Sequence, residues 1–204
     1  MSVPEVYIAT TFLHRYFSEK TVFNMNNAKF CFYGISRGDD RRDNPNFFES
    51  NRIILIPWNY LNIHWVLLFV DMEMLQFAVL DSLYEKIPPK EIEAEMNNMI
   101  RFLCTMKNEE QKENPDWKNI QGQDFKWIKD VGWLPKQGNV YDCGVFMLMN
   151  IYVMCYNKKC IYSQQDAKEF RNFLFRLMCD IVSYEEKELK KIKTDIMQGH
   201  KEKK

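Results

Sequence analysis

Glycine, proline and histidine are scarce in this sequence, and each shortage removes a class of function. The 204 residues include 7 Gly and 7 Pro, so no low-complexity, collagen-like or glycine-rich phosphate-binding segment is present. Basic residues are not in excess, because 28 Lys and Arg balance 28 Asp and Glu. No uninterrupted apolar run is longer than the six residues of Trp65–Val70, which is far shorter than a membrane span. We therefore expect neither a nucleic acid nor a membrane as a partner.

The 6 cysteines are scattered, and no two of them form a Cys-x-x-Cys motif. Cys155 and Cys160 have a spacing close to that of metal ligands, but their surroundings are apolar and the chain has only 3 His, so we expect no zinc site. The first residues have neither the basic start nor the apolar core of a secretory signal. A chain of this length can bury a core without disulfides. These features predict a reduced protein of the nucleus or cytoplasm, monomeric by default, with no metal and no cofactor.

The sequence does contain ample apolar material for a core, since 46% of its residues are hydrophobic and 15% are aromatic. Short runs of β-branched and aromatic residues predict neighbouring strands of a core sheet at Arg52–Pro57, His64–Asp71 and Leu75–Asp81. Residues Cys143–Tyr156 are apolar almost all round and too long for a strand, which predicts a buried central helix. The order of elements predicts an α+β fold in one domain, residues 1–204, with 183–204 as a charged C-terminal helix and tail.

The same patterns assign the rest of the chain. Apolar periodicity predicts further helices at residues 6–17, 90–106, 164–182 and 185–197. A short strand is expected at 29–33, and a strand or extended segment at 125–133. Polar or charged composition predicts a loop at 36–50 and a loop or insertion at 107–123.

Cys143 stands in a context suited to a nucleophile. It follows Asp142, precedes Gly144 and opens the predicted buried helix. A thiol at a helix N-terminus experiences the positive end of the helix dipole, which favours the thiolate. Gly144 permits the backbone of a substrate to approach the sulfur closely. The other five cysteines lie in apolar patterns and are expected to pack as small hydrophobes.

A cysteine nucleophile needs a base, an orienting group and donors for the oxyanion. His64 enters an apolar strand and is the candidate base, although a buried structural histidine is the simpler interpretation of such a residue. Asp81 follows the next strand, and antiparallel pairing would bring it beside His64; alternatively it is a turn residue paired with Ser82. The side-chain amide of Gln137 could donate to the oxyanion, or it could be an ordinary loop glutamine.

Together these residues carry a resemblance. His64 with Trp65, then Asp81, then the Gln-x-Asn-x-x-Asp-Cys-Gly element at Gln137–Gly144 resembles the SUMO/sentrin-specific protease family. These are papain-like cysteine peptidases that process ubiquitin-like modifiers. The resemblance extends over roughly residues 5–182 and includes Asn-Phe-Phe-Glu at 46–49, Ser163–Gln165 and the Phe-Arg pair at 170–171.

The resemblance implies a papain-like cysteine protease fold, with a central mixed or antiparallel sheet flanked by helices and the nucleophile at the start of a buried helix. It implies these roles: nucleophile for Cys143, general base and then acid for His64, orienting group for Asp81, and oxyanion donor for Gln137. Trp65 would wall a narrow channel for the modifier's Gly-Gly tail, although a plain core aromatic is the alternative. Asp142 would cap the helix or position the substrate.

The resemblance also implies a partner, namely SUMO or another ubiquitin-like modifier and its lysine-linked conjugates. A deubiquitinase or deneddylase with the same chemistry, and a catalytically inactive modifier-binding module, are the alternatives. The family's usual Trp-Leu-Asn-Asp opening is not matched, because alignment places Met1 where that Trp would stand. Either the sequence starts inside this motif or the cover of the tail channel is built differently. We expect the charged segment Ser36–Arg52 to contribute to modifier docking.

Overall fold

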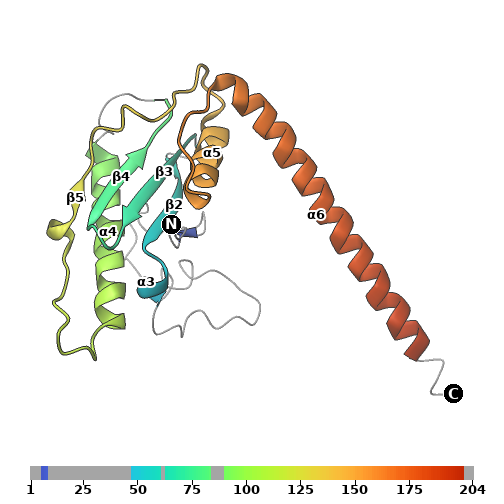
Figure 1. The fold of residues 1–204 in the computed structure, drawn as a ribbon, viewed down its shortest axis with the longest axis horizontal. Helices are drawn as coiled ribbons and strands as arrows, with labels where there is room; N and C mark the ends of the chain where they lie inside the picture. Colours follow the sequence, from blue (N-terminus) through green and yellow to red (C-terminus); the bar gives the residue numbers. More distant parts are fainter. Residues whose placement is uncertain (1–5, 9–46, 61–62, 84–89, 200–204) are drawn as a thin grey trace. The chain divides into compact units, whose positions relative to one another are not determined.

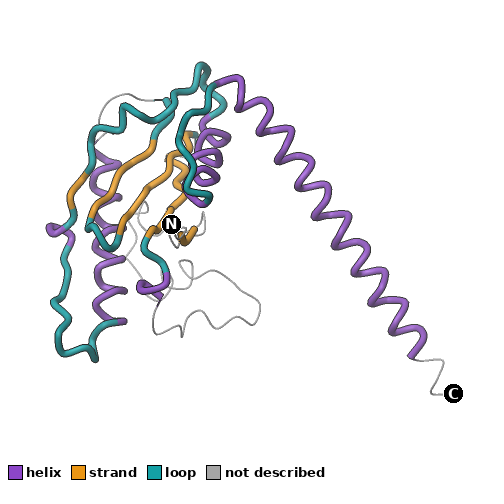
Figure 2. The backbone as a smooth tube through the Cα atoms, in the orientation of Figure 1, coloured by secondary structure: helices purple, strands orange, loops and turns teal. Residues whose placement is uncertain are grey.

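The computed structural model describes residues 6–8, 47–60, 63–83 and 90–199. They belong to two compact units, Met1–Gln164 and Gln165–Lys204, and each is considered by itself. The helices and strands are coloured by type in Figure 2. In chain order the elements of the first unit are β1 (Val6–Ile8), α3 (Phe47–Ser50), β2 (Ile53–Tyr60), β3 (His64–Asp71), β4 (Gln76–Leu80), α4 (Lys90–Glu110), the short 3₁₀ helix η2 (Gly122–Asp124), β5 (Lys126–Trp127) and α5 (Cys143–Cys155).

The described strands form one mixed sheet in the order β1-β2-β3-β4-β5. Strands β2, β3 and β4 pair antiparallel, whereas β1 pairs parallel to β2 and β5 pairs parallel to β4. The three strands predicted at the core of the sheet are therefore confirmed, as is the α+β class with a mixed central sheet. Since β3 and β4 run in opposite directions, His64 at the start of β3 lies at the same edge as Asp81, which follows β4.

Helices α4 and α5 cover opposite faces of this sheet (Figure 1). Ile54, Ile56 and Trp58 of β2 pack in the cluster that contains the buried side of α4. The alternating residue Leu55 packs with Met147 and Ile151 of α5. With both faces covered, the central strands bury nearly every side chain. This explains why they could be predicted from continuous apolar runs.

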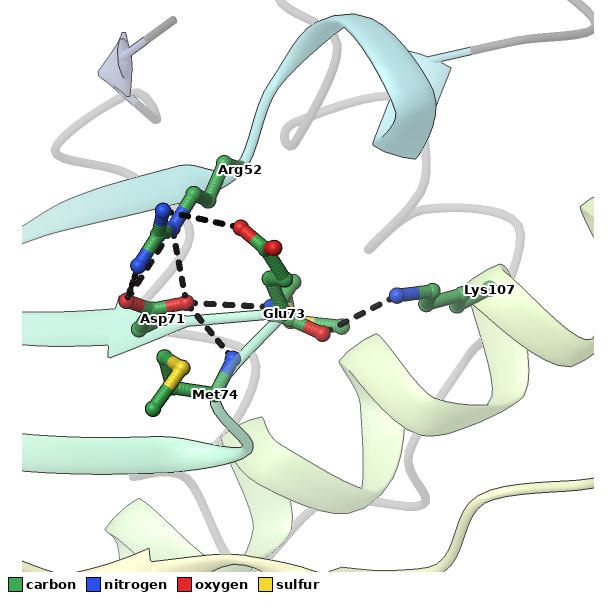
Figure 3. Close-up of polar contacts among 6 residues, drawn as sticks. Arg52, Asp71, Glu73, Met74 and Lys107 are labelled. Atoms are coloured by element: carbon green, nitrogen blue, oxygen red, sulfur yellow. Dashed lines mark hydrogen bonds and ion pairs between the residues drawn. The ribbon is translucent and has the colours of Figure 1, made fainter. Parts of the chain in front are cut away.

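The turn between β3 and β4 is fixed by charged groups at the edge of the sheet away from His64 (Figure 3). Asp71 Oδ1 accepts the backbone N–H groups of Glu73 (3.0 Å) and Met74 (2.9 Å). Arg52 donates to the same carboxylate and forms an ion pair of 2.8 Å with Glu73. Lys107 of α4 donates to the carbonyl oxygen of Met72 at 3.0 Å, which ties the turn to the helix.

The helix predicted at 90–106 is confirmed and continues to Glu110. Two contacts explain its extra length, because both of them hold residues beyond Met106. Lys107 donates to the β3–β4 turn, and the Glu110 carboxylate accepts the backbone N–H of Phe48 in α3 at 2.9 Å. These tertiary contacts favour helix in a polar stretch that the sequence pattern assigns to a loop.

Expectations for two further segments were wrong, and a third was confirmed only in part. Residues 6–8 form strand β1 instead of the start of a helix, because they pair with Ile53–Leu55. Residues 47–50 are helical, and the extended segment at 125–133 contains only two residues in a strand. The rest of the helix predicted at 6–17, the strand at 29–33 and the segment Ser36–Asn46 lie outside the described residues.

The second unit consists of the helix α6, Gln164–Gly199, whose first residue belongs to the first unit. Two helices were predicted here, at 164–182 and 185–197, but the structure has one. No glycine or proline interrupts the sequence between Gln164 and Gln198, so nothing in the chain ends the helix earlier. Among the described helices, α6 included, none combines the length and the apolar character that crossing a bilayer would need.

Candidate active site

Cys143 is the first residue of α5 and is buried, with 6% of its surface exposed. The helix is held in place by Met147 and Ile151, which pack against Leu67 and Leu80 of the sheet. The first turn forms through the backbone, since Phe146 N–H donates to the Asp142 carbonyl at 2.9 Å. The thiol therefore stands at the N-terminus of a rigidly packed helix, as the sequence predicts.

His64 and Asp81 meet where the antiparallel register brings them together. The distance between His64 Nε2 and Asp81 Oδ1 is 2.9 Å, and both residues are buried. The same carboxylate oxygen accepts the backbone N–H of Leu83 at 2.8 Å, which fixes the orientation of Asp81. Since a carboxylate only accepts, the proton of the imidazole lies on Nε2. The predicted contact between these two side chains is confirmed.

The electrostatics of His64 link it to Cys143. Burial lowers the pKa of His64, but the hydrogen bond and charge of Asp81 raise it, and so does a hydrogen bond with Cys143. The favourable contributions outweigh burial, and the pKa of His64 is raised above its ordinary value. Because Nε2 is directed at Asp81, Nδ1 is the nitrogen suited to take a proton from the thiol. The three side chains thus form a thiol–imidazole–carboxylate chain.

Gln137 is buried beside Ser82, the residue that follows Asp81. Ser82 Oγ donates to Gln137 Oε1 at 2.6 Å, and the backbone N–H of Gln137 donates to the Ser82 carbonyl at 2.9 Å. The other end of the amide, Nε2, donates to the Asn139 carbonyl at 2.5 Å. These contacts determine which end of the amide is oxygen and which is nitrogen. Nε2 carries a second hydrogen, which suits it to a second acceptor.

The indole of Trp65 lies beside Gly144. A Cβ atom added to Gly144 would lie 3.4 Å from Trp65 Cδ1 and 3.9 Å from its Nε1, so the helix backbone passes close to the indole. Trp65 is half-buried and packs against the cluster under α5. One part of the indole therefore packs in the hydrophobic core, and the rest is accessible beside Cys143.

Asp142 does not cap α5 with its side chain, so that expectation was wrong. Its carboxylate accepts hydrogen bonds from Asn139 Nδ2 at 2.6 Å and from Gln164 Nε2, which direct it away from the helix N–H groups. Only 2% of the residue is exposed. A contact between Asp142 and the substrate stays a prediction.

Two residues at the site, Ser82 and Gln164, were not assigned a role from the sequence. Ser82 was considered only as a local partner of Asp81. Gln164 lies in the segment Ser163–Gln165, which is part of the family resemblance. That resemblance is the sequence signal that could have pointed to Gln164 as a residue of the site. Both act on residues far along the chain, 55 positions away for Ser82 and Gln137, and 26 for Gln164 and Gly138. Contacts between residues so far apart in the chain cannot be predicted from local sequence patterns.

The other described cysteines are poorly suited to nucleophilic chemistry. Cys104 lines a cavity of about 520 Å³ between α4 and residues 120–123, and burial raises the pKa of its thiol to about 11. Burial also raises the pKa of Cys155 and Cys160. Cys104 and Cys155 pack in the core clusters as predicted. Cys160 is half-buried but lies outside the helices and strands, Cys179 is exposed, against expectation, and Cys31 lies outside the described residues. In the part of the chain that the structure describes, no group of three or more potential ligands could hold a metal ion.

Comparison with solved structures supports the fold. The C-terminal Ulp1 protease domain in complex with Smt3, the yeast ortholog of SUMO, superposes with a TM-score of 0.59 at 24% identity, covering 84% of this chain and 66% of that one. The Chaetomium thermophilum Ulp1-like SUMO protease catalytic domain superposes with a TM-score of 0.53 at 17% identity, covering 83% of this chain and 59% of that one. The predicted papain-like protease fold is thereby confirmed.

Comparison with characterised sequences identifies relatives in Arabidopsis thaliana. One carries the provisional name ubiquitin-like-specific protease 1B and is 25% identical over 168 residues, which cover 82% of this chain and 45% of the relative. The ubiquitin-like-specific protease ESD4 is 24% identical over 168 residues, which cover 82% of this chain and 31% of that protein. The chain thus spans less than half the length of these relatives.

The family assignment rests on the largest match. The model of the Ulp1 protease family, C-terminal catalytic domain, matches residues 1–182, and this range includes His64, Asp81, Gln137 and Cys143. The resemblance stated from these residues is confirmed. With its thiol, imidazole and carboxylate assembled at one edge of the sheet, the chain belongs to the Ulp1 protease family.

Proposed function

We propose that this domain is a cysteine protease that cleaves after the C-terminal Gly-Gly of SUMO or a related ubiquitin-like modifier, releasing it from lysine conjugates, from a precursor, or from both. The observation that carries the proposal is the 2.9 Å contact between His64 and Asp81, with His64 also hydrogen-bonded to Cys143 at the start of α5. The yeast domain whose fold this chain shares is complexed with Smt3, which supports a SUMO-type partner.

The reaction begins with activation of the thiol. His64 Nδ1 takes the proton of Cys143, and the imidazolium is stabilised by Asp81 across the 2.9 Å contact. The thiolate attacks the carbonyl carbon of the modifier's last glycine and forms a tetrahedral intermediate. Its oxyanion is stabilised by the second Nε2 hydrogen of Gln137 and by the backbone N–H of Cys143.

Two further steps complete the turnover. The intermediate collapses, the C–N bond to the lysine breaks, and the leaving amine takes the proton held by His64. A water molecule then attacks the thioester while His64 accepts one of its protons. Collapse of the second intermediate breaks the C–S bond and releases the modifier's C-terminal carboxylic acid, which ionises in water. The proton held by His64 returns to the sulfur of Cys143. No metal or cofactor is needed for this sequence of steps.

Trp65 and Gly144 suit a substrate tail without side chains. The indole lies against the helix backbone beside the thiol, where a Cβ on Gly144 would already reach 3.4 Å from the ring. We assign these residues to the binding of the modifier's Gly-Gly tail, because a flat ring next to a glycine leaves room for backbone and excludes branched side chains.

We assign residues 1–204 to one peptidase domain, in which residues 183–199 are the charged C-terminal part of α6. The family match over residues 1–182 supports this division. The domain is proposed to act as a monomer in the nucleus or cytoplasm, without contact to nucleic acid or membrane. Docking of the modifier body on Ser36–Arg52 stays a prediction, since most of this segment lies outside the described residues.

The test uses three probes, SUMO, ubiquitin and the Nedd-type modifier, each carrying a C-terminal electrophile. We expect the SUMO probe to label the folded protein at Cys143, and the Cys143→Ala variant to remain unlabelled. Cys179→Ser, which removes an exposed cysteine, is the matched control and should label like the wild type. Preferential labelling by another modifier would reassign the substrate. Absence of labelling by all three would refute the enzymatic proposal and favour a binding module.

A further inference from the structure

Gln164 holds two points of the segment that precedes Cys143. Its Oε1 atom accepts the backbone N–H of Gly138 at 2.6 Å, and its Nε2 atom donates to Asp142 Oδ2. The side chain also packs along the glycine, because a Cβ at Gly138 would lie 3.6 Å from Gln164 Oε1. One amide therefore bridges the two ends of residues 138–142.

Those two ends adjoin the groups that the proposed reaction uses. Gly138 directly follows Gln137, whose Nε2 is the proposed oxyanion donor, and Asp142 directly precedes Cys143, whose backbone N–H is the other donor. The distance between the two donors therefore depends on the conformation of residues 138–142. A bridge across this segment restricts how far they can move apart.

The segment is also braced from within. Asn139 Oδ1 accepts the backbone N–H groups of Tyr141 (3.1 Å) and Asp142 (3.0 Å), and Asn139 Nδ2 donates to the Asp142 carboxylate at 2.6 Å. Asn139 thus shapes the C-terminal half of the segment. Gln164 is the residue that connects this half to Gly138, because its amide contacts both.

The chemistry of the two ends selects an amide. Gly138 offers a hydrogen, and the Asp142 carboxylate, in a residue only 2% exposed, requires one. A glutamine presents an acceptor and a donor on one rigid plane. Glutamate would keep the acceptor for Gly138 but would place a second carboxylate against Asp142, which repels it unless one of the two is protonated.

We infer that Gln164 is a positioning residue that sets the separation of the two oxyanion donors, Gln137 Nε2 and the Cys143 backbone N–H. The inference rests on the proposed function, since it concerns the same site, and Gln164 itself is not expected to touch the substrate. Its loss should affect acyl transfer, which needs the oxyanion donors, more than activation of the thiol, which needs His64 and Asp81.

The experiment compares Gln164→Ala and Gln164→Glu with Gln165→Glu, a neighbouring exposed glutamine at the same helix start. Turnover of a SUMO tail substrate and alkylation of Cys143 by iodoacetamide are measured for each variant. We expect kcat to fall about 10- to 100-fold in both Gln164 variants, with KM nearly unchanged. Alkylation, which forms no oxyanion, should proceed at the wild-type rate, and Gln165→Glu should match the wild type in both assays.

The pH profile separates positioning from a general loss of structure. The kcat of Gln164→Glu relative to wild type should rise as pH falls, because a protonated glutamate regains the donor toward Asp142. For Gln164→Ala the same ratio should stay flat. A wild-type kcat in both Gln164 variants would overturn the inference about Gln164 but not the proposed function. So would alkylation of Cys143 that slows in parallel with kcat. A wild-type protein that turns over no modifier would overturn the proposed function and this inference with it.

Discussion

Asp81 and Ser82 are adjacent at the end of β4, yet they contact two different side chains of the candidate active site. Asp81 Oδ1 lies 2.9 Å from His64 Nε2, and Ser82 Oγ donates to Gln137 Oε1 at 2.6 Å. The end of one strand therefore orients both the proposed base and the proposed oxyanion donor. A change in either residue should be visible in catalysis, through a different step in each case.

Ser82→Ala should lower kcat by about 10-fold, because the Gln137 amide loses the donor that fixes its oxygen. The lost hydrogen bond should also lower the free energy of unfolding by about 1 kcal/mol. Steady-state turnover and urea denaturation measure the two effects. Thr105→Ala removes a hydroxyl on α4 that donates to the Arg101 carbonyl at 3.0 Å, and it is the control for loss of a hydrogen bond away from the site. Equal kcat values in the two variants would contradict the role of Ser82.

The raised pKa of His64 predicts how stability depends on pH. The folded protein binds the imidazole proton more tightly than the unfolded chain does, so His64 contributes stability that is complete below the unfolded pKa of about 6.5. This contribution should disappear as pH rises through the higher folded pKa. Urea denaturation of wild type and His64→Gln across this range should show a difference in unfolding free energy that shrinks with rising pH. A difference that grows with pH would show that the folded pKa is lowered instead.

Gly144→Ala should separate binding from folding. The added Cβ would stand 3.4 Å from Trp65 Cδ1, an ordinary contact distance, and alanine favours a helix over glycine by about 1 kcal/mol. We expect a melting temperature equal to or above that of the wild type, together with a KM for the tail substrate raised several-fold. Gly122→Ala, where the nearest contact would be Arg101 Cγ at 3.5 Å in the η2 region, is the control for glycine replacement. An unchanged KM for Gly144→Ala would place the tail elsewhere.

Asp71→Ala should destabilise the fold without altering the chemistry. It removes the acceptor of two backbone N–H groups and the partner of Arg52, which should lower the unfolding free energy by about 1–3 kcal/mol. Because this turn lies at the edge of the sheet away from His64, kcat per folded molecule should be unchanged. Glu73→Ala, at a side chain that is 65% exposed, should cost less than about 1 kcal/mol. A lower kcat in Asp71→Ala, measured below its melting temperature, would contradict this separation.

The elements and side-chain pairs that could be predicted from the sequence are those whose signal lies in a short stretch of the chain or in the pairing of neighbouring strands. Strands β2 to β4 and helix α5 were predicted because burial on all sides leaves an unbroken apolar signal in the sequence. The pair His64 and Asp81 could be predicted because antiparallel neighbours bring a strand start beside a strand end. By contrast, β1 was read as a helix, since Ile8 fits both periods until Ile53–Leu55 supplies its partner strand.

The side-chain partners of the loop before Cys143 could not be predicted. Gln164 and Ser82 are far from their partners along the chain, so no spacing in the sequence predicts these contacts. Asp142 illustrates the same limit, because its type and position suit a helix cap, yet amide donors from Asn139 and Gln164 engage its carboxylate. Which donors the Asp142 carboxylate binds depends on where those donors lie in the folded structure. The preference of aspartate for helix N-termini contains no information about that.

The β3–β4 turn has an evolutionary consequence. Its length, from Asp71 to Gln76, sets the register in which Leu67 faces Leu80, and in this register His64 lies within reach of Asp81 at the other end of the hairpin. Inserting or deleting one residue would reverse the faces of one strand relative to the other. Relatives that keep the activity should therefore vary in the identity of these turn residues but hold their number constant.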